Sequence, residues 1–137
     1  MVTMLKTRRL VNTLIIILGV AVSWTAAALQ VHDYQGTPYA SGGIGAEEQE
    51  QLKTMAGRFN LKLVFADRSG EFLADIQVHI QDPQSKVVLE AVSTGPWFYA
   101  KLPPGAYTVQ VSGFGQQFER QVQVEEKGLR EFVFRWK

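Results

Sequence analysis

The apolar positions between residues 46 and 59 repeat with the period of an α-helix. Four of them follow the i, i+3, i+4, i+7 spacing and therefore share one stripe: Leu52, Met55, Ala56 and Phe59. Glutamates lie in the first turns of this segment and Arg58 in its last turn, an order that suits the helix dipole. The pattern predicts an amphipathic helix over 46–58 whose apolar stripe docks on the rest of the domain.

From residue 61 onward the apolar period changes to two. Short alternating or apolar segments follow one another, separated by turn-forming residues: 61–65, 72–80, 86–93, 97–102, 106–112, 117–125 and 129–136. We expect the first two segments to form a hairpin around the turn at 68–70. Because no helix interleaves with the strands, the sequence predicts a mainly β fold, a seven-stranded antiparallel β-sandwich with one N-terminal helix.

The aromatic residues of these segments divide between two faces. Trp97 and Tyr99 share one face of their strand and Phe98 takes the other, because side chains alternate along a strand. The last segment places three aromatic residues on a face that we expect in the core: Phe132, Phe134 and Trp136. Phe98 has two open positions, packed under the helix or exposed in a contact patch. If the helix detaches to bind a partner, the possible partner-binding residues are Phe98, Leu52 and Met55.

The N-terminal segment has the layout of an export signal. Basic residues precede an uncharged run from Leu10 to Val31, and the alanines at 26–28 offer a signal-peptidase site. We expect cleavage after Ala28. An uncleaved anchor is the alternative, because about twenty uncharged residues are enough to cross a bilayer. Both interpretations place the domain outside the cytoplasm, either periplasmic or secreted, or anchored in the membrane by its N-terminus.

Composition fits one ordinary domain with a short appendage. The chain has 137 residues, of which 46% are hydrophobic and 20% charged. Removal of residues 1–28 leaves 11 basic and 13 acidic residues, a net charge of −2, so we expect no nucleic-acid partner. The turn-rich stretch 29–45 has no sustained period. The predicted organisation is a signal peptide over 1–28, a linker over 29–45, the helix within 46–59 and the β-sandwich over 60–137.

Few groups in the chain suit catalysis or metal binding. No cysteine is present, which excludes thiol catalysis and cysteine-ligated zinc. His79 lies opposite the apolar positions of its strand, so we expect it to face solvent. A metal site that joined His79 to Asp75 and His32–Asp33 would require the linker to fold back. The stretch Gly42–Gly45 lacks the preceding strand and following Lys-Ser or Lys-Thr of a phosphate-binding loop. We therefore expect no enzyme activity and no cofactor or metal.

The most specific stretch runs from Gly95 to Val109 and reads GPWFYAKLPPGAYTV. It resembles the aromatic-x-aromatic and Leu-Pro-Pro-Gly-x-Tyr-x-Val pattern of carboxypeptidase regulatory-like domains, which have a transthyretin-like (prealbumin-like) β-sandwich. The resemblance covers 61–136 and suggests the small exported bacterial type of this domain. Pro104 and Gly105 suit positions i+1 and i+2 of a type II turn, which requires a positive φ at Gly105.

The resemblance implies a non-catalytic module for folding, interaction or carbohydrate contact, and it assigns no catalytic residue to this chain. A hydrolytic branch of the transthyretin-related proteins needs several clustered histidines, whereas this chain has only His32 and His79. We expect a non-enzymatic exported accessory or protein-interaction module whose partner is an envelope protein or a polysaccharide. The alternative is a carbohydrate or small-molecule binding protein of the cell envelope.

Overall fold

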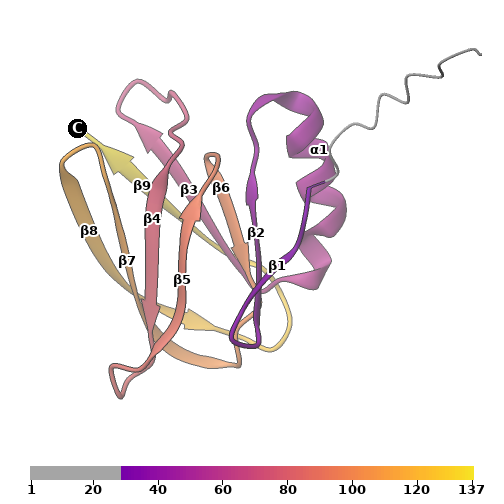
Figure 1. Cartoon of the computed structure of the whole chain (residues 1–137), viewed down its shortest axis with the longest axis vertical. Helices are drawn as coiled ribbons and strands as arrows, with labels where there is room; N and C mark the ends of the chain where they lie inside the picture. The colour runs from indigo at the N-terminus through magenta and orange to yellow at the C-terminus, as the bar shows by residue number, and fades with distance from the viewer. Residues whose placement is uncertain (1–28) are drawn as a thin grey trace, which may run out of the picture.

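The computed structural model describes residues 29–137, which form two β-sheets and one α-helix (Figure 1). The predicted signal peptide, its cleavage after Ala28 and the alternative anchor fall on residues 1–28, outside the described residues. Within residues 29–137, no helix is both long and apolar enough to cross a membrane.

The strands are divided between a five-stranded and a four-stranded sheet. Sheet A has the order β1 (His32–Tyr34), β2 (Thr37–Gly42), β6 (Trp97–Ala100), β3 (Leu61–Asp67) and β9 (Arg130–Trp136). Sheet B has the order β5 (Val87–Ser93), β4 (Ile76–Gln81), β7 (Gly105–Gly113) and β8 (Gln116–Val124). The mainly β fold with an N-terminal helix is confirmed. The predicted count of seven strands was wrong, since the described chain forms nine.

The two additional strands lie in the segment that was interpreted as a linker. β1 and β2 form an antiparallel hairpin, and β2 pairs with β6 at the centre of sheet A. The hairpin turns at Gln35 and Gly36, which have φ values of 46° and 93°. Positive φ at both central residues is typical of a tight hairpin turn. Gly36, one of the turn-forming residues of the predicted linker, therefore serves a turn between two short strands.

The predicted hairpin of the first two sandwich strands was also wrong. β3 lies in sheet A and β4 in sheet B. Only a short local contact links the two sides of the turn, an isolated bridge between Ala66 and Phe72 with backbone hydrogen bonds from Asp67 to Glu71 and from Leu73 to Phe65. Both edges of β3 are already occupied, because it pairs with β6 on one side and with β9 on the other. The β3–β9 pair is parallel, so the sandwich is not purely antiparallel.

The main core fills the space between the two sheets. It contains the inward-facing aliphatic residues of β3, β4 and β7, together with Phe65, Phe98, Phe134 and Trp136. Phe134 and Trp136 are buried and Phe132 is half-buried against the core, so the predicted aromatic face of the last strand is confirmed. The buried Asn60 side chain closes the lower end of the core, because its amide bonds the backbone of Leu102 and of Glu125 at 2.7–3.0 Å.

Helix α1 (Gly45–Met55) continues into one 3₁₀ turn (Ala56–Arg58), close to the predicted 46–58. Figure 1 shows the helix beside β2 on the side of sheet A that faces away from sheet B. A second buried cluster fills this contact and contains Ala40, Leu52, Phe59, Val64, Trp97 and Tyr99. The predicted docking of the helical stripe is therefore confirmed. Phe98 does not pack under the helix, because it points to the opposite side, into the main core, and is fully buried.

Candidate binding site

The outer face of sheet B is the broad sheet surface that the helix leaves uncovered. In each strand the apolar residues point inward, so polar side chains point outward at every second position. Six glutamines take part in this surface. We call it the amide face and define it by its residues: Gln77, His79, Gln81, Thr108, Gln110, Ser112, Gln117, Glu119, Gln121 and Gln123.

Strand register orders the amide face into rows across the sheet. One row runs from Glu90 on β5 through His79 and Gln110 to Glu119 on β8. His79 Nδ1 lies 3.0 Å from Glu90 Oε1, and the Gln110 amide donates to Glu119 Oε2 at 2.9 Å. Gln81 Nε2 lies 2.9 Å from His79 Nε2. Because an amide nitrogen can only donate, His79 Nε2 accepts this bond, and the imidazole proton lies on Nδ1, which donates to Glu90. This row therefore presents donors and acceptors in fixed orientations.

Two clefts lie at the lower end of sheet B and share Asp82 and Tyr107. The first has a volume of about 270 Å³ and continues the amide face, because its lining includes Gln81, Thr108 and Gln121. The second has a volume of about 460 Å³ and lies between the turns of two hairpins. Its lining includes Gln35, Gly36, Thr37, Lys86, Val87, Val88, Lys101 and Pro103. We call this pair of cavities the Asp82 clefts.

The polar groups of the Asp82 clefts are fixed by backbone contacts. Asp82 Oδ1 accepts the N–H groups of Gln84 and Lys86 at 2.9 Å. The Tyr107 hydroxyl donates to the Pro103 carbonyl at 2.6 Å. Burial, together with the Asp82 carboxylate, raises the pKa of the Tyr107 phenol. The hydroxyl therefore remains protonated and leaves an oxygen lone pair for a ligand.

Two lysines give the larger cleft a basic rim. Lys101 donates from Nζ to the Glu126 carbonyl oxygen at 3.0 Å, which holds the ammonium group in place without neutralising it. Within residues 29–137, the ion pairs involve Lys53, Lys62 and His79 and neither lysine of this cleft. A ligand in the larger cleft would therefore meet two cations, one carboxylate and several hydrogen-bonding groups.

The structure does not assemble the possible partner-binding residues on one surface. Phe98 and Leu52 are fully buried, in two different clusters, and Met55 is half-buried beside Leu52. Phe98 therefore contributes to no exposed contact patch in this conformation. The docked helix likewise leaves Leu52 no access to a partner.

The weighed metal ligands also lie apart. His79 belongs to the amide-face row described above, and His32 stacks on Tyr39 in sheet A. Among residues 29–137, no cluster of three or more histidine and carboxylate side chains could hold a metal ion.

The aromatic residues under the helix form a structural site rather than an open stacking surface. Lys62 points from β3 across the outer side of sheet A, and its Nζ lies 3.9 Å from the centroid of the Trp97 ring. The same Nζ lies 3.7 Å from Glu131 Oε2 on β9. This arrangement allows a lysine to be largely buried, because the ring face and the carboxylate both stabilise its charge. The Lys62 ammonium group occupies the face of the Trp97 ring on which a sugar or base would otherwise stack.

No protein-family model matches this chain, and no curated protein matches it in sequence. The candidate site therefore depends on its own geometry. Sequence reasoning missed the Asp82 clefts, although two local signals lay beside them. Asp82-Pro83 marked a turn, and Tyr107 belonged to the stretch that resembles carboxypeptidase regulatory-like domains.

Proposed function

We propose that this chain is an exported, non-enzymatic accessory module that contacts an envelope partner through the amide face of sheet B. The observation that carries the proposal is the difference in cover between the two sheets. Helix α1 buries the outer side of sheet A, whereas sheet B leaves rows of amide, hydroxyl and carboxylate groups open to solvent. Such a surface contacts a partner through many hydrogen bonds, in the way that polar interfaces do.

The carboxypeptidase regulatory-like character of residues 61–136 belongs to the same proposal. Two packed sheets and a Leu-Pro-Pro-Gly connection from β6 to β7 support it. The proposal includes export by the N-terminal segment, which leaves the module outside the cytoplasm, either released by cleavage after Ala28 or anchored by the uncleaved segment.

The contact surface is tested by site-specific photo-crosslinking in cells that export the chain. A photoreactive side chain at Gln121 lies on the amide face and on the first cleft. The matched control carries the same group at Thr54, an exposed position on α1. We expect a discrete adduct from position 121 and none from position 54. Equal adducts at both positions, or adducts from position 54 alone, would contradict the proposal.

The Asp82 clefts favour a second candidate function, binding of a carbohydrate or another small polar ligand. A cleft of about 460 Å³ with hydrogen-bonding walls and two lysines fits a ligand that carries hydroxyl and acidic groups. Titration with acidic oligosaccharides tests it. We expect binding that weakens at least tenfold in the double variant Lys86→Gln, Lys101→Gln and stays unchanged in Lys53→Gln. Equal weakening in the control would indicate attraction by overall charge.

A further inference from the structure

Three exposed apolar side chains gather at one end of the sandwich. Phe114, Ile44 and Phe72 are exposed to 67%, 60% and 54%, and they are the most exposed large hydrophobic residues of the described chain. Phe114 lies in the turn from β7 to β8, Ile44 directly before α1, and Phe72 in the loop from β3 to β4. Figure 1 shows these three connections at the same end of the molecule, opposite the β4–β5 turn.

Contacts between these connections confirm that they are neighbours. Ile44 and Phe72 line one shallow hollow of about 260 Å³, together with Leu73, Ala74 and Pro96. β7 ends against the same loop, because a Cβ on Gly113 would lie 2.8 Å from the Ile76 side chain and 3.8 Å from the Asp75 carbonyl oxygen. We call Ile44, Phe72 and Phe114 the apolar end.

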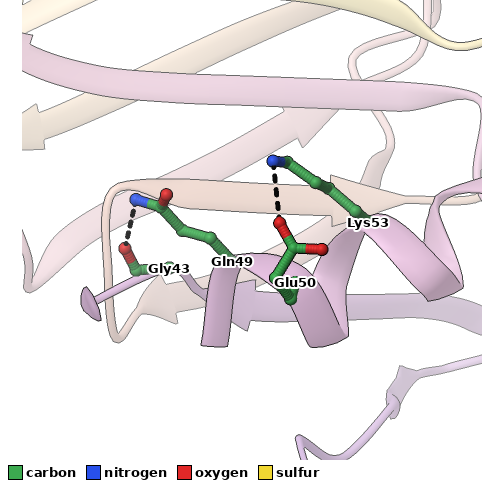
Figure 2. Close-up of polar contacts among 4 residues, drawn as sticks. All are labelled: Gly43, Gln49, Glu50 and Lys53. Atoms are coloured by element: carbon green, nitrogen blue, oxygen red, sulfur yellow. Dashed lines mark hydrogen bonds and ion pairs between the residues drawn. The ribbon is translucent and has the colours of Figure 1, made fainter. Parts of the chain in front are cut away.

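The position of Ile44 is fixed by the fold. Figure 2 shows the Gln49 side chain, which reaches back from α1 and donates to the Gly43 carbonyl oxygen at 3.0 Å. Gly43 itself lies over the Trp97 ring, where an added Cβ would be 3.1 Å from the ring. The hydrogen bond from Gln49 and the contact with the Trp97 ring therefore hold Gly43 in place. This geometry keeps Ile44, the next residue, outside the core.

The chain enters the domain at this same end. Because β1 runs antiparallel to β2, Leu29 lies beside the upper end of β2, and its side chain is 3.0 Å from the position of a Cβ on Gly42. The Leu29 N–H also points to Gln51 Oε1 at 3.4 Å. The uncharged run of the sequence, Leu10 to Val31, reaches into this packed segment. No spacer separates the run from the folded domain.

From this geometry we propose that the apolar end docks on the lipid bilayer that holds the uncharged N-terminal run. A run of about twenty uncharged residues is long enough to stay in a bilayer. The absence of a spacer then brings the Leu29 end of the domain to the membrane surface. Aromatic and aliphatic side chains are favoured at that surface, where they leave water without losing a hydrogen bond. The Asp82 clefts, at the opposite end, point away from the membrane.

Charge does not drive this contact. Arg68 and Lys137 lie at this end, but Glu47 and Glu71 accompany them. Docking through apolar insertion is therefore expected in neutral phosphatidylcholine vesicles and to be insensitive to salt, unlike attraction to anionic lipids.

The experiment uses the full chain of residues 1–137 in phosphatidylcholine vesicles that contain nitroxide-labelled lipid. The sequence has no cysteine, so a single introduced cysteine can carry an environment-sensitive fluorophore. Glu71→Cys places the label beside Phe72, and Gln84→Cys places the matched control in the turn at the opposite end. We expect lipid quenching at position 71 to exceed that at position 84 at least fivefold. The double variant Ile44→Ser, Phe72→Ser should reduce quenching at position 71 at least threefold while the melting temperature stays within a few degrees.

Three results would overturn the proposal. The label at position 71 would be no more quenched than the label at position 84 in vesicle-bound chain. The fluorescence change at position 71 would depend on protein concentration and not on lipid, which would indicate that a second copy of the chain covers this end. The chain would be recovered in soluble form beginning at Leu29 from cells that express the full sequence. Crosslinking at Gln121 tests the amide face separately, so the two proposals can fail independently.

Discussion

The two outer faces of the sandwich differ in what covers them. On sheet A, the side chains of Trp97 and Tyr99 are buried under α1, and β6 is buried on both faces. On sheet B, β4 is buried on alternate residues only, and Gln77 faces solvent. One face thus contributes to the free energy of folding through apolar contacts, while the other retains groups that can bind something else.

This difference in cover separates stability from recognition. A substitution on the outer side of sheet A should lower the free energy of unfolding and leave the amide face intact. A substitution on the amide face should leave the free energy of unfolding unchanged and weaken contact with the partner. Single variants on each face reveal whether the two faces are independent.

The largest effect is expected for Leu52→Asp. Leu52 is fully buried between α1 and sheet A, so the variant loses apolar burial and places a carboxylate among aromatic rings. The free energy of unfolding should fall by about 4 kcal/mol, measured by urea denaturation. Thr54→Asp is the matched control on the exposed side of the same helix and should change it little. A Leu52→Asp variant with an unchanged midpoint would mean that the helix is not a fixed part of the domain.

A smaller loss is expected for Gly95→Ala, at the turn from β5 to β6. A Cβ at this position would lie 2.3 Å from the Gly42 carbonyl oxygen, so the turn and the end of β2 would have to move apart. We expect a loss of about 2 kcal/mol. Gly57→Ala is the control, because nothing lies within 4 Å of its Cβ position. Equal stability of the two variants would show that the turn at Gly95 and the end of β2 can move apart at little cost in free energy.

Alkaline pH should weaken the covered face through Tyr99. Burial, and secondarily the charge of Glu131, raises the pKa of this phenol from 10.0 to about 12. The folded state therefore holds the phenolic proton more tightly than the unfolded state. Its contribution to stability is complete below pH 10 and is lost as the pH rises to about 12. Tyr99→Phe should flatten the pH dependence of the unfolding free energy over this range, and an unaltered slope would contradict the assignment.

Gly105→Ala should have a more modest effect. Gly105 begins β7 with φ of 154°, which confirms the positive φ expected from sequence, although a type II turn would place it nearer 80°. Space is not limiting, because nothing lies within 4 Å of its Cβ position. Backbone strain alone should lower the unfolding free energy by about 1 kcal/mol. An unchanged melting temperature would show that the strand start relaxes without cost.

The strand pattern could be predicted from sequence where burial on one or two faces leaves a clear signature. Each of the seven predicted segments overlaps a strand of the structure, because alternation or continuous apolar character marks each of them. The continuous run Trp97–Ala100 also signals a strand covered on both sides. Periodicity could not tell which side the helix covers, and neither position left open for Phe98, under the helix or in an exposed patch, is the observed one in the main core.

Pairing and the candidate site depend on contacts distant in sequence. The β3–β9 pair joins Leu61 to Arg130, and nothing in the local pattern indicates that this pair, rather than a hairpin with β4, occupies the edge of β3. β1 has only three residues, and β2 reads TPYASG, in which proline, serine and glycine resemble a turn more than an alternating strand. The larger Asp82 cleft likewise joins Gly36, Lys86 and Lys101, which only the folded chain brings together.

The smallest effect on stability is expected on the amide face. Gln110 is half-exposed, and its amide donates to the exposed Glu119. Gln110→Thr keeps a residue that favours strands, so the free energy of unfolding should change by less than about 0.5 kcal/mol. The same variant removes the central amide of the row from Glu90 to Glu119. It should therefore reduce the adduct formed from a photoreactive group at Gln121, whereas Leu52→Asp should reduce it only as far as the chain unfolds. A full adduct in Gln110→Thr would restrict recognition to the Asp82 clefts, and a large loss of stability would mean that the open face also supports the fold.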